Sequence, residues 1–288
     1  MKNIIIYIVV SILIFISIFI FYNFMNKSNF ENLPKKNLIF TSVGNNTEFY
    51  KNWLGKNRNY DIWAVYYDDN EQNYEKYKSM VDRIWNFKGS KFQNFYKIYK
   101  TYYNELMNYD RFLIIDDDII MNTDDINNLF LISSQFNLDI CQPAFIKGKS
   151  KISHLITTAE DNVFMKYVNF VEVNTPLFSK KALLNLMKYY DTSLIGWGID
   201  YLYMWANDLN SKNKFAIIDS IQCINPHDVK KNNKRELTKI KNFDQRIKYW
   251  TEFALKKRIP TSWPHKIYKK IYIKPNEDEN IFKKKLNI

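Results

Sequence analysis

The first long apolar stretch of the chain has no polar face. Residues 4–22 read IIIYIVVSILIFISIFIFY and contain no charged residue. As a helix that rises ~1.5 Å per residue, this run would span about 28 Å, close to the hydrocarbon thickness of a bilayer. A cleaved secretory signal would end in small residues, whereas bulky and polar residues follow this run. We therefore expect an uncleaved transmembrane anchor over residues 1–24, followed by a polar stalk over residues 25–36.

Basic residues flank the predicted anchor on both sides. Lys2 precedes it, and Lys27, Lys35 and Lys36 follow it. The positive-inside rule slightly favours a cytoplasmic body, and a luminal body stays open as the alternative. The sequence thus predicts a single-pass membrane protein without settling the side on which its body lies.

Beyond the stalk, short apolar segments alternate with amphipathic ones. The segments 47–54 and 92–108 have helical patterns, and the expected strands are 37–42, 61–67, 111–115, 138–142, 170–175 and 216–221. This alternation is typical of an α/β fold, a Rossmann-type mixed but mostly parallel sheet flanked by helices. Such sheets bind their ligands at the carboxyl ends of the strands. We place this domain at residues 37–230 and expect a basic helical extension over residues 231–288.

Composition and charge narrow the possible classes of protein. The chain has 288 residues, of which 46% are hydrophobic and 17% aromatic, so it can bury a large core and is not a disordered chain. Its two cysteines, Cys141 and Cys223, exclude a disulfide scaffold, and we favour two buried thiols over one bridge. A net charge of +12 suits partners that carry negative charge, but the Lys-rich composition explains part of it. Since no nucleic-acid-binding signature is present, we expect no nucleic-acid partner.

Three adjacent carboxylates follow one of the expected strands. Asp116, Asp117 and Asp118 come directly after the apolar sequence FLII. Because side chains alternate along an extended chain, Asp116 and Asp118 point to the same side. Such a pair can hold Mn²⁺ or Mg²⁺, and the ion can bridge a diphosphate. The alternative is a solvated acidic turn that precedes a helix near Thr123.

A second motif places an aromatic residue between two glycines. The sequence GWGID contains Trp197, Gly198 and Asp200. Glycine lets the backbone approach a ligand closely, and the Trp197 ring offers a flat apolar face to a sugar. Asp200 is then a candidate general base for an acceptor hydroxyl. The alternative is a loop folded around a core tryptophan, with Asp200 capping the helix that follows.

One histidine follows the last expected strand. His227 stands in the sequence NPHD, shortly after the strand 216–221. Imidazole suits Mn²⁺ as a companion to carboxylates. A single histidine after a strand is also an ordinary loop residue, so the position alone does not decide between the two interpretations.

Taken in order, these motifs resemble the domain of unknown function 707 family, a glycosyltransferase-like group. The resemblance rests on the DDD triplet, on DICQPA at 139–144, on NFVEVNTPLFS at 169–179, on GWGID, on IDS at 218–220 and on His227. It covers roughly residues 37–230. The wider relatives of this family are nucleotide-sugar transferases of the GT-A fold, so the resemblance implies a GT-A-like catalytic domain.

The resemblance implies roles for the metal and donor residues. Asp116 and Asp118 match the DxD-type pair that holds a divalent metal, Mn²⁺ or Mg²⁺, and through it the diphosphate of the sugar nucleotide. His227 matches a late histidine that often completes the coordination. By location, the donor nucleotide is expected at Thr41, Ser42, Asp68, Lys91 and Asp116.

The resemblance also implies roles on the acceptor side. Asp200 is similar to the acidic residue that deprotonates the acceptor in inverting relatives. Glu172, in the sequence FVEV, is a second candidate for this base. Trp197 and Gly198 are expected to contact the acceptor.

The sequence therefore predicts a membrane-anchored, metal-dependent glycosyltransferase, with inversion as the expected stereochemistry. Its expected partners are a nucleotide-sugar donor, a glycan or glycolipid acceptor and the membrane. One alternative is a phosphate-ester hydrolase or nucleotidyltransferase that uses the same acidic triplet. Another is a non-catalytic, membrane-anchored carbohydrate-binding protein. The sequence contains no GxxxxGK[ST] phosphate loop, which argues against a P-loop enzyme.

Overall fold

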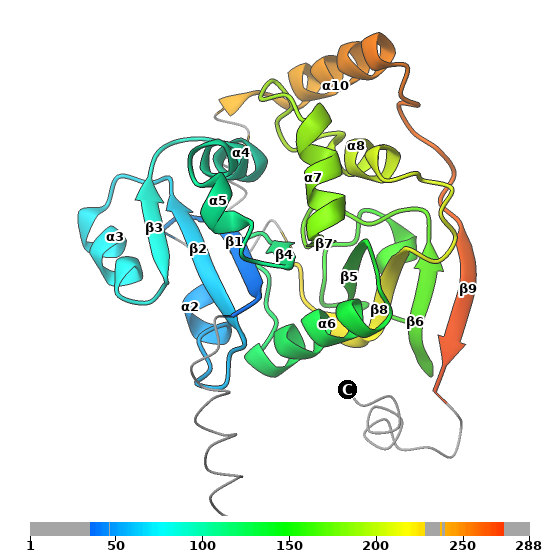
Figure 1. Ribbon diagram of the computed structural model, residues 1–288, viewed down its shortest axis with the longest axis horizontal. Coiled ribbons are helices and arrows are strands. Elements are labelled where there is room, and N and C mark those ends of the chain that lie inside the picture. The colour runs from blue at the N-terminus through cyan, green and yellow to red at the C-terminus, as the bar shows by residue number, and fades with distance from the viewer. Residues whose placement is uncertain (1–34, 46, 228–236, 238–239, 274–288) are drawn as a thin grey trace, which may run out of the picture. The chain divides into compact units, whose positions relative to one another are not determined.

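The computed structural model (Figure 1) describes residues 35–45, 47–227, 237 and 240–273. The predicted anchor at residues 1–24 and all but the end of the predicted stalk lie outside these residues. Within the part of the chain that is described, no helix is long and apolar enough to cross a bilayer. The described helices and strands belong to the compact unit Lys36–Ile288.

Strands and helices alternate along most of this unit. The strands are β1 (Asn37–Val43), β2 (Tyr60–Tyr66), β3 (Arg83–Asn86), β4 (Arg111–Ile114), β5 (Ile140–Phe145), β6 (Val163–Val168), β7 (Leu177–Ser179), β8 (Phe215–Cys223) and β9 (Ile267–Tyr272). The helices are α2 (Phe49–Asn52), α3 (Glu71–Lys78), α4 (Lys91–Thr101), α5 (Tyr103–Leu106), α6 (Thr123–Gln135), α7 (Lys180–Tyr189), α8 (Ile199–Ala206) and α10 (Phe243–Lys257), with a short 3₁₀ turn, η1 (Leu155–Thr157). The predicted α/β class is therefore correct.

The strands form one nine-stranded mixed sheet in the order β3-β2-β1-β4-β7-β5-β8-β6-β9. Strands β3, β2, β1 and β4 are all parallel. Strand β7 is antiparallel to both β4 and β5, so β5 and its parallel neighbour β8 run in the same direction as β4. Strand β6 is antiparallel to β8 and to β9. Seven of the nine strands therefore run in one direction and only β7 and β6 run against it, so the predicted mixed, mostly parallel sheet is confirmed.

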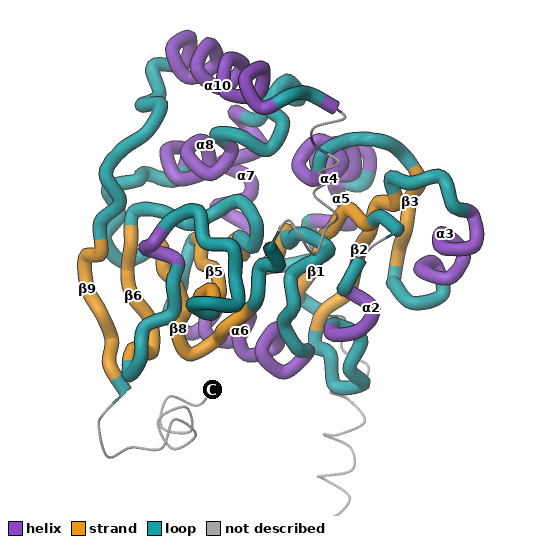
Figure 2. Tube along the Cα trace, turned by 180° about the vertical axis from the view of Figure 1, so that it is seen from behind, coloured by secondary structure: helices purple, strands orange, loops and turns teal. Residues whose placement is uncertain are grey.

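Helices cover both faces of the sheet, and a hydrophobic core lies under each layer (Figures 1 and 2). Alternation along β1 separates the two cores: Leu38 and Phe40 pack toward α4, α7 and α8, whereas Ile39 packs toward α2 and α6. Full burial of such a side chain contributes roughly 1.5–3 kcal/mol. Cys141 and Cys223 are buried free thiols, as the sequence predicts.

The segment 170–175 is not the strand that its sequence predicts. It forms an irregular connection between β6 and β7. The carbonyl oxygens of Val173 and Asn174 accept hydrogen bonds from the Lys91 side chain, at 2.8 and 3.1 Å. The Asn174 carbonyl oxygen also accepts the backbone N–H of Asp116 at 2.9 Å, so one side chain and one main-chain donor bond to this segment in place of a continuous strand pairing. The alternating apolar residues of this segment pack instead as a loop over the core that contains Val171.

The C-terminal part of the unit is integrated with the fold. Helix α10 packs on the core of α7 and α8 through Trp250 and Ala254. Strand β9 pairs with β6 and forms one edge of the sheet, as Figure 1 shows. The predicted extension over residues 231–288 therefore differs from the structure in two respects: part of it is a strand, and its described elements share the core and sheet of the preceding domain.

Candidate active site

The candidate site lies where the adjacent parallel strands β1 and β4 reach their carboxyl ends. Thr41 is fully buried near the end of β1, and no described residue hydrogen-bonds to its hydroxyl. Ser42 Oγ accepts a hydrogen bond from Asn94 Nδ2 of α4 at 2.9 Å. Gln93 Oε1 accepts the N–H of Ser90 at 2.9 Å, and this hydrogen bond caps the first turn of α4. The start of α4 is therefore fixed against the end of β1.

Lys91, the first residue of α4, connects this helix to the acidic triplet. Its Nζ lies 2.8 Å from Asp116 Oδ1 and also donates to the carbonyl oxygens of Val173 and Asn174. Those three contacts match the three donors of an ammonium group. Burial lowers the pKa of Lys91, and the negative charge of Asp116 opposes that effect. Lys91 therefore lies at the strand ends within ion-pair distance of Asp116.

The middle residue of the triplet is turned toward the protein. Asp117 Oδ2 accepts the N–H of Gly44 at 3.1 Å, and the Asp117 carbonyl oxygen accepts the N–H of Glu48 and the hydroxyl of Thr47. Burial, followed by the charge of Asp118, raises the pKa of Asp117 to about 8. Asp117 thus ties the loop after β1 to the loop after β4.

Glu172 has a buried carboxyl whose pKa is influenced by Asp116, at the carboxyl end of β4. Glu172 is only 3% exposed. Its backbone N–H donates to Gln142 Oε1 at 2.5 Å, and its Oε1 accepts from Asn174 Nδ2 at 3.0 Å. No described residue donates a hydrogen bond to Oε2. Burial, then the charges of Asp200 and Asp116, raise the pKa of Glu172 to about 8.

Asp200 is the second buried carboxyl, in the first turn of α8. Burial raises its pKa to about 7, although the backbone N–H of Tyr201 donates to its Oδ1 at 3.0 Å. Gly198 precedes the helix with φ of +80°, and a Cβ there would lie 2.2 Å from Trp250 Cδ2. Glycine therefore lets α8 start close to α10.

Because their charges influence one another, we treat four residues as the carboxyl–lysine cluster: Lys91, Asp116, Glu172 and Asp200.

Two other predicted residues have their own contacts. Asp68, after β2, accepts the N–H of Asn45 at 2.8 Å through Oδ2, so it lies beside the loop that follows β1. Trp197 is 39% exposed and packs edge to face on Phe243, with ring centroids 5.0 Å apart. The predicted roles of Asp68 at the nucleotide and of Trp197 and Gly198 at the acceptor stay predictions.

The segments that carry Asp118 and His227 run side by side. Ile120 and Ile224 form an antiparallel bridge with reciprocal hydrogen bonds of 3.0 Å. This bridge lies two residues after Asp118 and three residues before His227. Nevertheless, across the described residues, no group of three or more His, Cys, Asp and Glu side chains is arranged to hold a metal ion. The predicted metal site at Asp116, Asp118 and His227 stays a prediction.

Sequence reasoning missed two side chains that hold the Glu172 loop. Gln142 accepts the Glu172 N–H, and Asn174 donates to the Glu172 carboxyl. Gln142 stands in β5, whose six residues are all buried. A lone amide in such a strand signals a buried polar partner, because buried amides are nearly always hydrogen-bonded. Asn174 gives no comparable signal.

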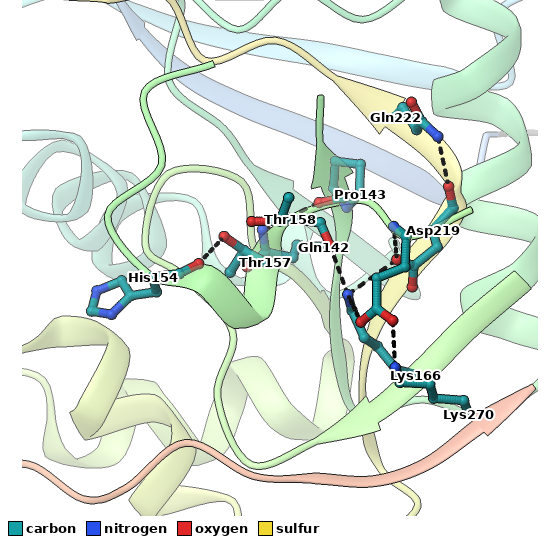
Figure 3. Close-up of polar contacts among 10 residues, drawn as sticks. Gln142, Pro143, His154, Thr157, Thr158, Lys166, Asp219, Gln222 and Lys270 are labelled. Atoms are coloured by element: carbon teal, nitrogen blue, oxygen red, sulfur yellow. Dashed lines mark hydrogen bonds and ion pairs between the residues drawn. The ribbon is translucent and has the colours of Figure 1, made fainter. Parts of the chain in front are cut away.

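A second buried polar cluster lies between β6 and β8 (Figure 3). Lys166 is fully buried, and its Nζ contacts Asp219 Oδ1 at 3.1 Å, Glu160 Oε1 at 3.0 Å and the carbonyl oxygen of Thr158 at 2.7 Å. Asp219 also accepts the N–H of Glu160 at 3.0 Å. Lys270 of β9 forms an ion pair with the other Glu160 oxygen. This cluster fixes the chain around residues 158–160 to the sheet.

Comparisons with known proteins give only distant matches. No family model and no curated protein matches the chain, so the resemblance to the domain of unknown function 707 family stays a prediction. Among solved structures, the chain is similar to S. aureus TarS 1-349, with 11% identity and a TM-score of 0.49 over 76% of this chain and 64% of that one. The same TarS fragment in complex with UDP-GlcNAc matches with 11% identity and a TM-score of 0.48, over 76% of this chain and 66% of that one. A197 from STIV matches with 12% identity and a TM-score of 0.40, over 65% of this chain and 84% of that one. At these identities and TM-scores, the matches assign no activity, ligand or residue role to this chain.

Proposed function

We propose that this protein is a glycosyltransferase that moves a sugar from a nucleotide-sugar donor to a hydroxyl of a glycan or lipid-linked acceptor. The observation that carries the proposal is the Glu172 carboxyl. It is buried, its pKa is raised to about 8, and it lies within electrostatic reach of Asp116 at the ends of the parallel strands. A carboxyl with such a pKa is suited to exchange a proton near neutral pH.

In the proposed complex, the donor diphosphate lies against Lys91 and the acidic triplet. The Lys91 ammonium attracts phosphate oxygens by its charge, and it would bond to one by exchanging one of its three present contacts with Asp116 and the carbonyl oxygens of Val173 and Asn174. The nucleoside extends toward the ends of β1 and β2, near Thr41, Ser42 and Asp68. These strands are parallel neighbours, so their carboxyl ends share one edge of the sheet, where α/β proteins bind ligands.

The proposal includes a divalent metal. Asp116 and Asp118 are the residues that would hold Mn²⁺ or Mg²⁺, because such ions are commonly bound by one or two carboxylates together with substrate phosphates. When bound, the ion would neutralise charge on the leaving diphosphate. Lys91 supplies positive charge to the same place from the chain itself.

The proposed reaction is a direct displacement. A carboxylate takes the proton of the acceptor hydroxyl while that oxygen bonds to the anomeric carbon. The bond from the anomeric carbon to the phosphate oxygen breaks, and the nucleoside diphosphate leaves with the bonding electrons. Glu172 and Asp200 are the two candidates for the base. Attack opposite the leaving group inverts the anomeric configuration, so we propose an inverting enzyme.

Membrane attachment completes the proposal. An anchor over residues 1–24 would hold the catalytic unit beside a membrane, where lipid-linked acceptors are found. The proposal does not depend on the side of the membrane.

The function is tested by measuring nucleoside diphosphate release from a panel of nucleotide sugars. The full-length chain in detergent is incubated with each donor, with and without Mn²⁺ and an acceptor mixture. We expect release that requires the acceptor, is stimulated by Mn²⁺ and falls by roughly a hundredfold in Glu172→Gln or Asp200→Asn, in the range usual for loss of a general base. Lys100→Ala, an exposed residue of α4, is the control. Hydrolysis of simple phosphate esters without any sugar would instead support the hydrolase alternative.

A further inference from the structure

An open pocket of about 590 Å³ lies beside η1 and the start of β9. Its volume is within the range of roughly 300–1,000 Å³ that small-ligand sites occupy. The residues that line it come from two distant parts of the sequence, residues 153–156 and 160 on one side, and His265 and Ile267 on the other. We refer to it as the histidine pocket. It does not include Trp197 or Gly198, the residues that the sequence assigns to an acceptor.

The walls of the histidine pocket are fixed by contacts behind them. The His265 ring stacks on Phe170, with ring centroids 3.9 Å apart and an interplanar angle of 18°. The His154 ring lies 4.5 Å from Phe170 and 5.0 Å from His265. On the other wall, Lys166 holds the carbonyl of Thr158 and the carboxylate of Glu160. Figure 3 shows the Lys166 contacts, together with the hydrogen bond from Thr157 to the His154 carbonyl oxygen. The pocket is thus formed before a ligand arrives.

The chemistry of the histidine pocket suits a neutral ligand with both apolar and hydroxyl surfaces. The charge of Glu160 is already balanced by Lys166 and Lys270. Burial and the nearby His265 lower the pKa of His154 to about 4, so its imidazole is neutral at pH 7. Apolar surface remains open at Leu155, which is 87% exposed, and at Ile267, which is 41% exposed. A sugar ring has this combination of an apolar C–H face and hydroxyl groups that bond imidazole nitrogens and carboxylates.

The histidine pocket also adjoins the carboxyl–lysine cluster. The hydroxyls of Thr157 and Ser153 lie near enough to the Glu172 carboxyl to oppose the rise in its pKa. Ser153 itself lines the pocket. On its other side, Glu172 experiences the charge of Asp116, which pairs with Lys91. Glu172 is therefore influenced both by Ser153, which lines the pocket, and by Asp116 at the proposed donor site, although its own side chain does not line the pocket.

We propose that the histidine pocket binds a neutral saccharide acceptor and directs its reacting hydroxyl toward Glu172. The role of the saccharide as an acceptor rests on the proposed function. Binding of a saccharide in the pocket can be tested without any donor. It also selects Glu172 over Asp200 as the base for that acceptor.

The first experiment measures binding directly. The full chain is treated with diethylpyrocarbonate, which modifies neutral imidazoles, in the presence of methyl and p-nitrophenyl glycosides of the common hexoses and N-acetylhexosamines. Mass spectrometry follows His154, His265 and His227. We expect at least one glycoside at ten times its Kd to slow modification of His154 and His265 by roughly tenfold, as site occupancy dictates. His227, outside the pocket, should react at its unprotected rate. Equal rates at His154 and His265 with and without every glycoside would overturn the inference.

The second experiment separates this inference from the proposed function. Leu155→Asp changes the exposed rim of the pocket, and Leu255→Asp, on a 69% exposed leucine of α10, is the matched control. We expect Leu155→Asp to raise the KM for the protecting glycoside by roughly tenfold and to leave the donor KM unchanged. Transfer with an unchanged glycoside KM would overturn the inference and leave the proposed function intact. Histidine protection without transfer from any donor would overturn the proposed function and leave saccharide binding intact.

Discussion

The ammonium of Lys91 lies 2.8 Å from Asp116 Oδ1. This contact joins the start of α4 to the acidic triplet, and the remaining donors of Lys91 hold the loop that carries Glu172. Lys91 therefore links the strand ends to the loop of the buried carboxyl, alongside the Asp116 N–H, which donates to the Asn174 carbonyl oxygen at 2.9 Å. This arrangement brings together residues that are 81 positions apart in the sequence, from Lys91 to Glu172.

The pH dependence of the rate should identify the base. A base must be deprotonated to act, so the rate should rise with pH through about 8 if Glu172 is the base, and through about 7 if Asp200 is. With a saccharide acceptor that binds in the histidine pocket, we expect the rate to rise with an apparent pKa near 8. Steady-state rates between pH 5 and 10 check this, with Glu172→Gln and Asp200→Asn compared at each pH. A limb near 8 that persists in Glu172→Gln contradicts the assignment.

The stability of the protein should fall as Glu172 ionises. Its pKa is raised from 4.5 to about 8, so the folded state retains a proton that the unfolded state has lost between these values. In this window, the group lowers the free energy of unfolding by up to about 1.4 kcal/mol per pH unit as pH rises. Urea denaturation at pH 5 and pH 9 should show a smaller loss of stability in Glu172→Gln than in the wild type. Equal losses would show that Glu172 ionises normally in the folded state.

Gly198→Ala should weaken the contact between α8 and α10. The new Cβ would lie 2.2 Å from Trp250 Cδ2, at a φ of +80°. Gly148→Ala is the matched control, because its φ is +76° but no atom lies within 4 Å of its Cβ. We expect the control to lose about 1–2 kcal/mol of unfolding free energy from the backbone conformation alone. Gly198→Ala should lose about 1–3 kcal/mol more from overpacking. Equal urea midpoints would refute the predicted clash.

Lys166 and Asp219 should be strongly coupled. Both side chains are fully buried and lie 3.1 Å apart, so Lys166→Met leaves a buried carboxylate without its cation. The single variant should lose about 3–5 kcal/mol of stability. In a double-mutant cycle with Asp219→Leu, the double variant should be more stable than the sum of the two single losses predicts. Additive losses, measured by urea denaturation, would show that the pair is not coupled.

The sequence predicts best the elements that local pattern determines. Strands β1, β2, β4 and β8 carry apolar residues bounded by polar turns, and the structure places them within one or two residues of the predicted ends. Strand β9 has the sequence IYKKIY, whose two central lysines do not predict a strand. It forms by pairing with β6 at the edge of the sheet. The segment 170–175 has the alternation of a strand but is a loop, whose carbonyl groups accept hydrogen bonds from the Lys91 side chain and from the backbone N–H of Asp116.

The same limit applies to the candidate site. Asp116, Glu172 and Asp200 carry recognisable chemistry, so sequence reasoning selects them. Their mutual influence depends on contacts between distant segments, which no local pattern encodes. The histidine pocket is a stronger case, because His154 and His265 meet only when the chain after α10 returns to the sheet. Lys166 was detectable in principle as one charge in the buried sequence VFMKYV.

Binding of a nucleotide sugar beside Lys91 is the central claim, and a thermal-shift titration tests it most directly. Wild type, Lys91→Ala and the control Lys100→Ala are titrated as full chains with a panel of nucleoside diphosphate sugars and Mn²⁺. A donor at a hundred times its Kd adds about 2.7 kcal/mol to the free energy of unfolding. The account predicts that at least one nucleotide sugar stabilises the wild type and Lys100→Ala by this amount, and that Lys91→Ala loses most of the effect. Stabilisation that is equal in Lys91→Ala, or absent with every nucleotide sugar, would contradict it.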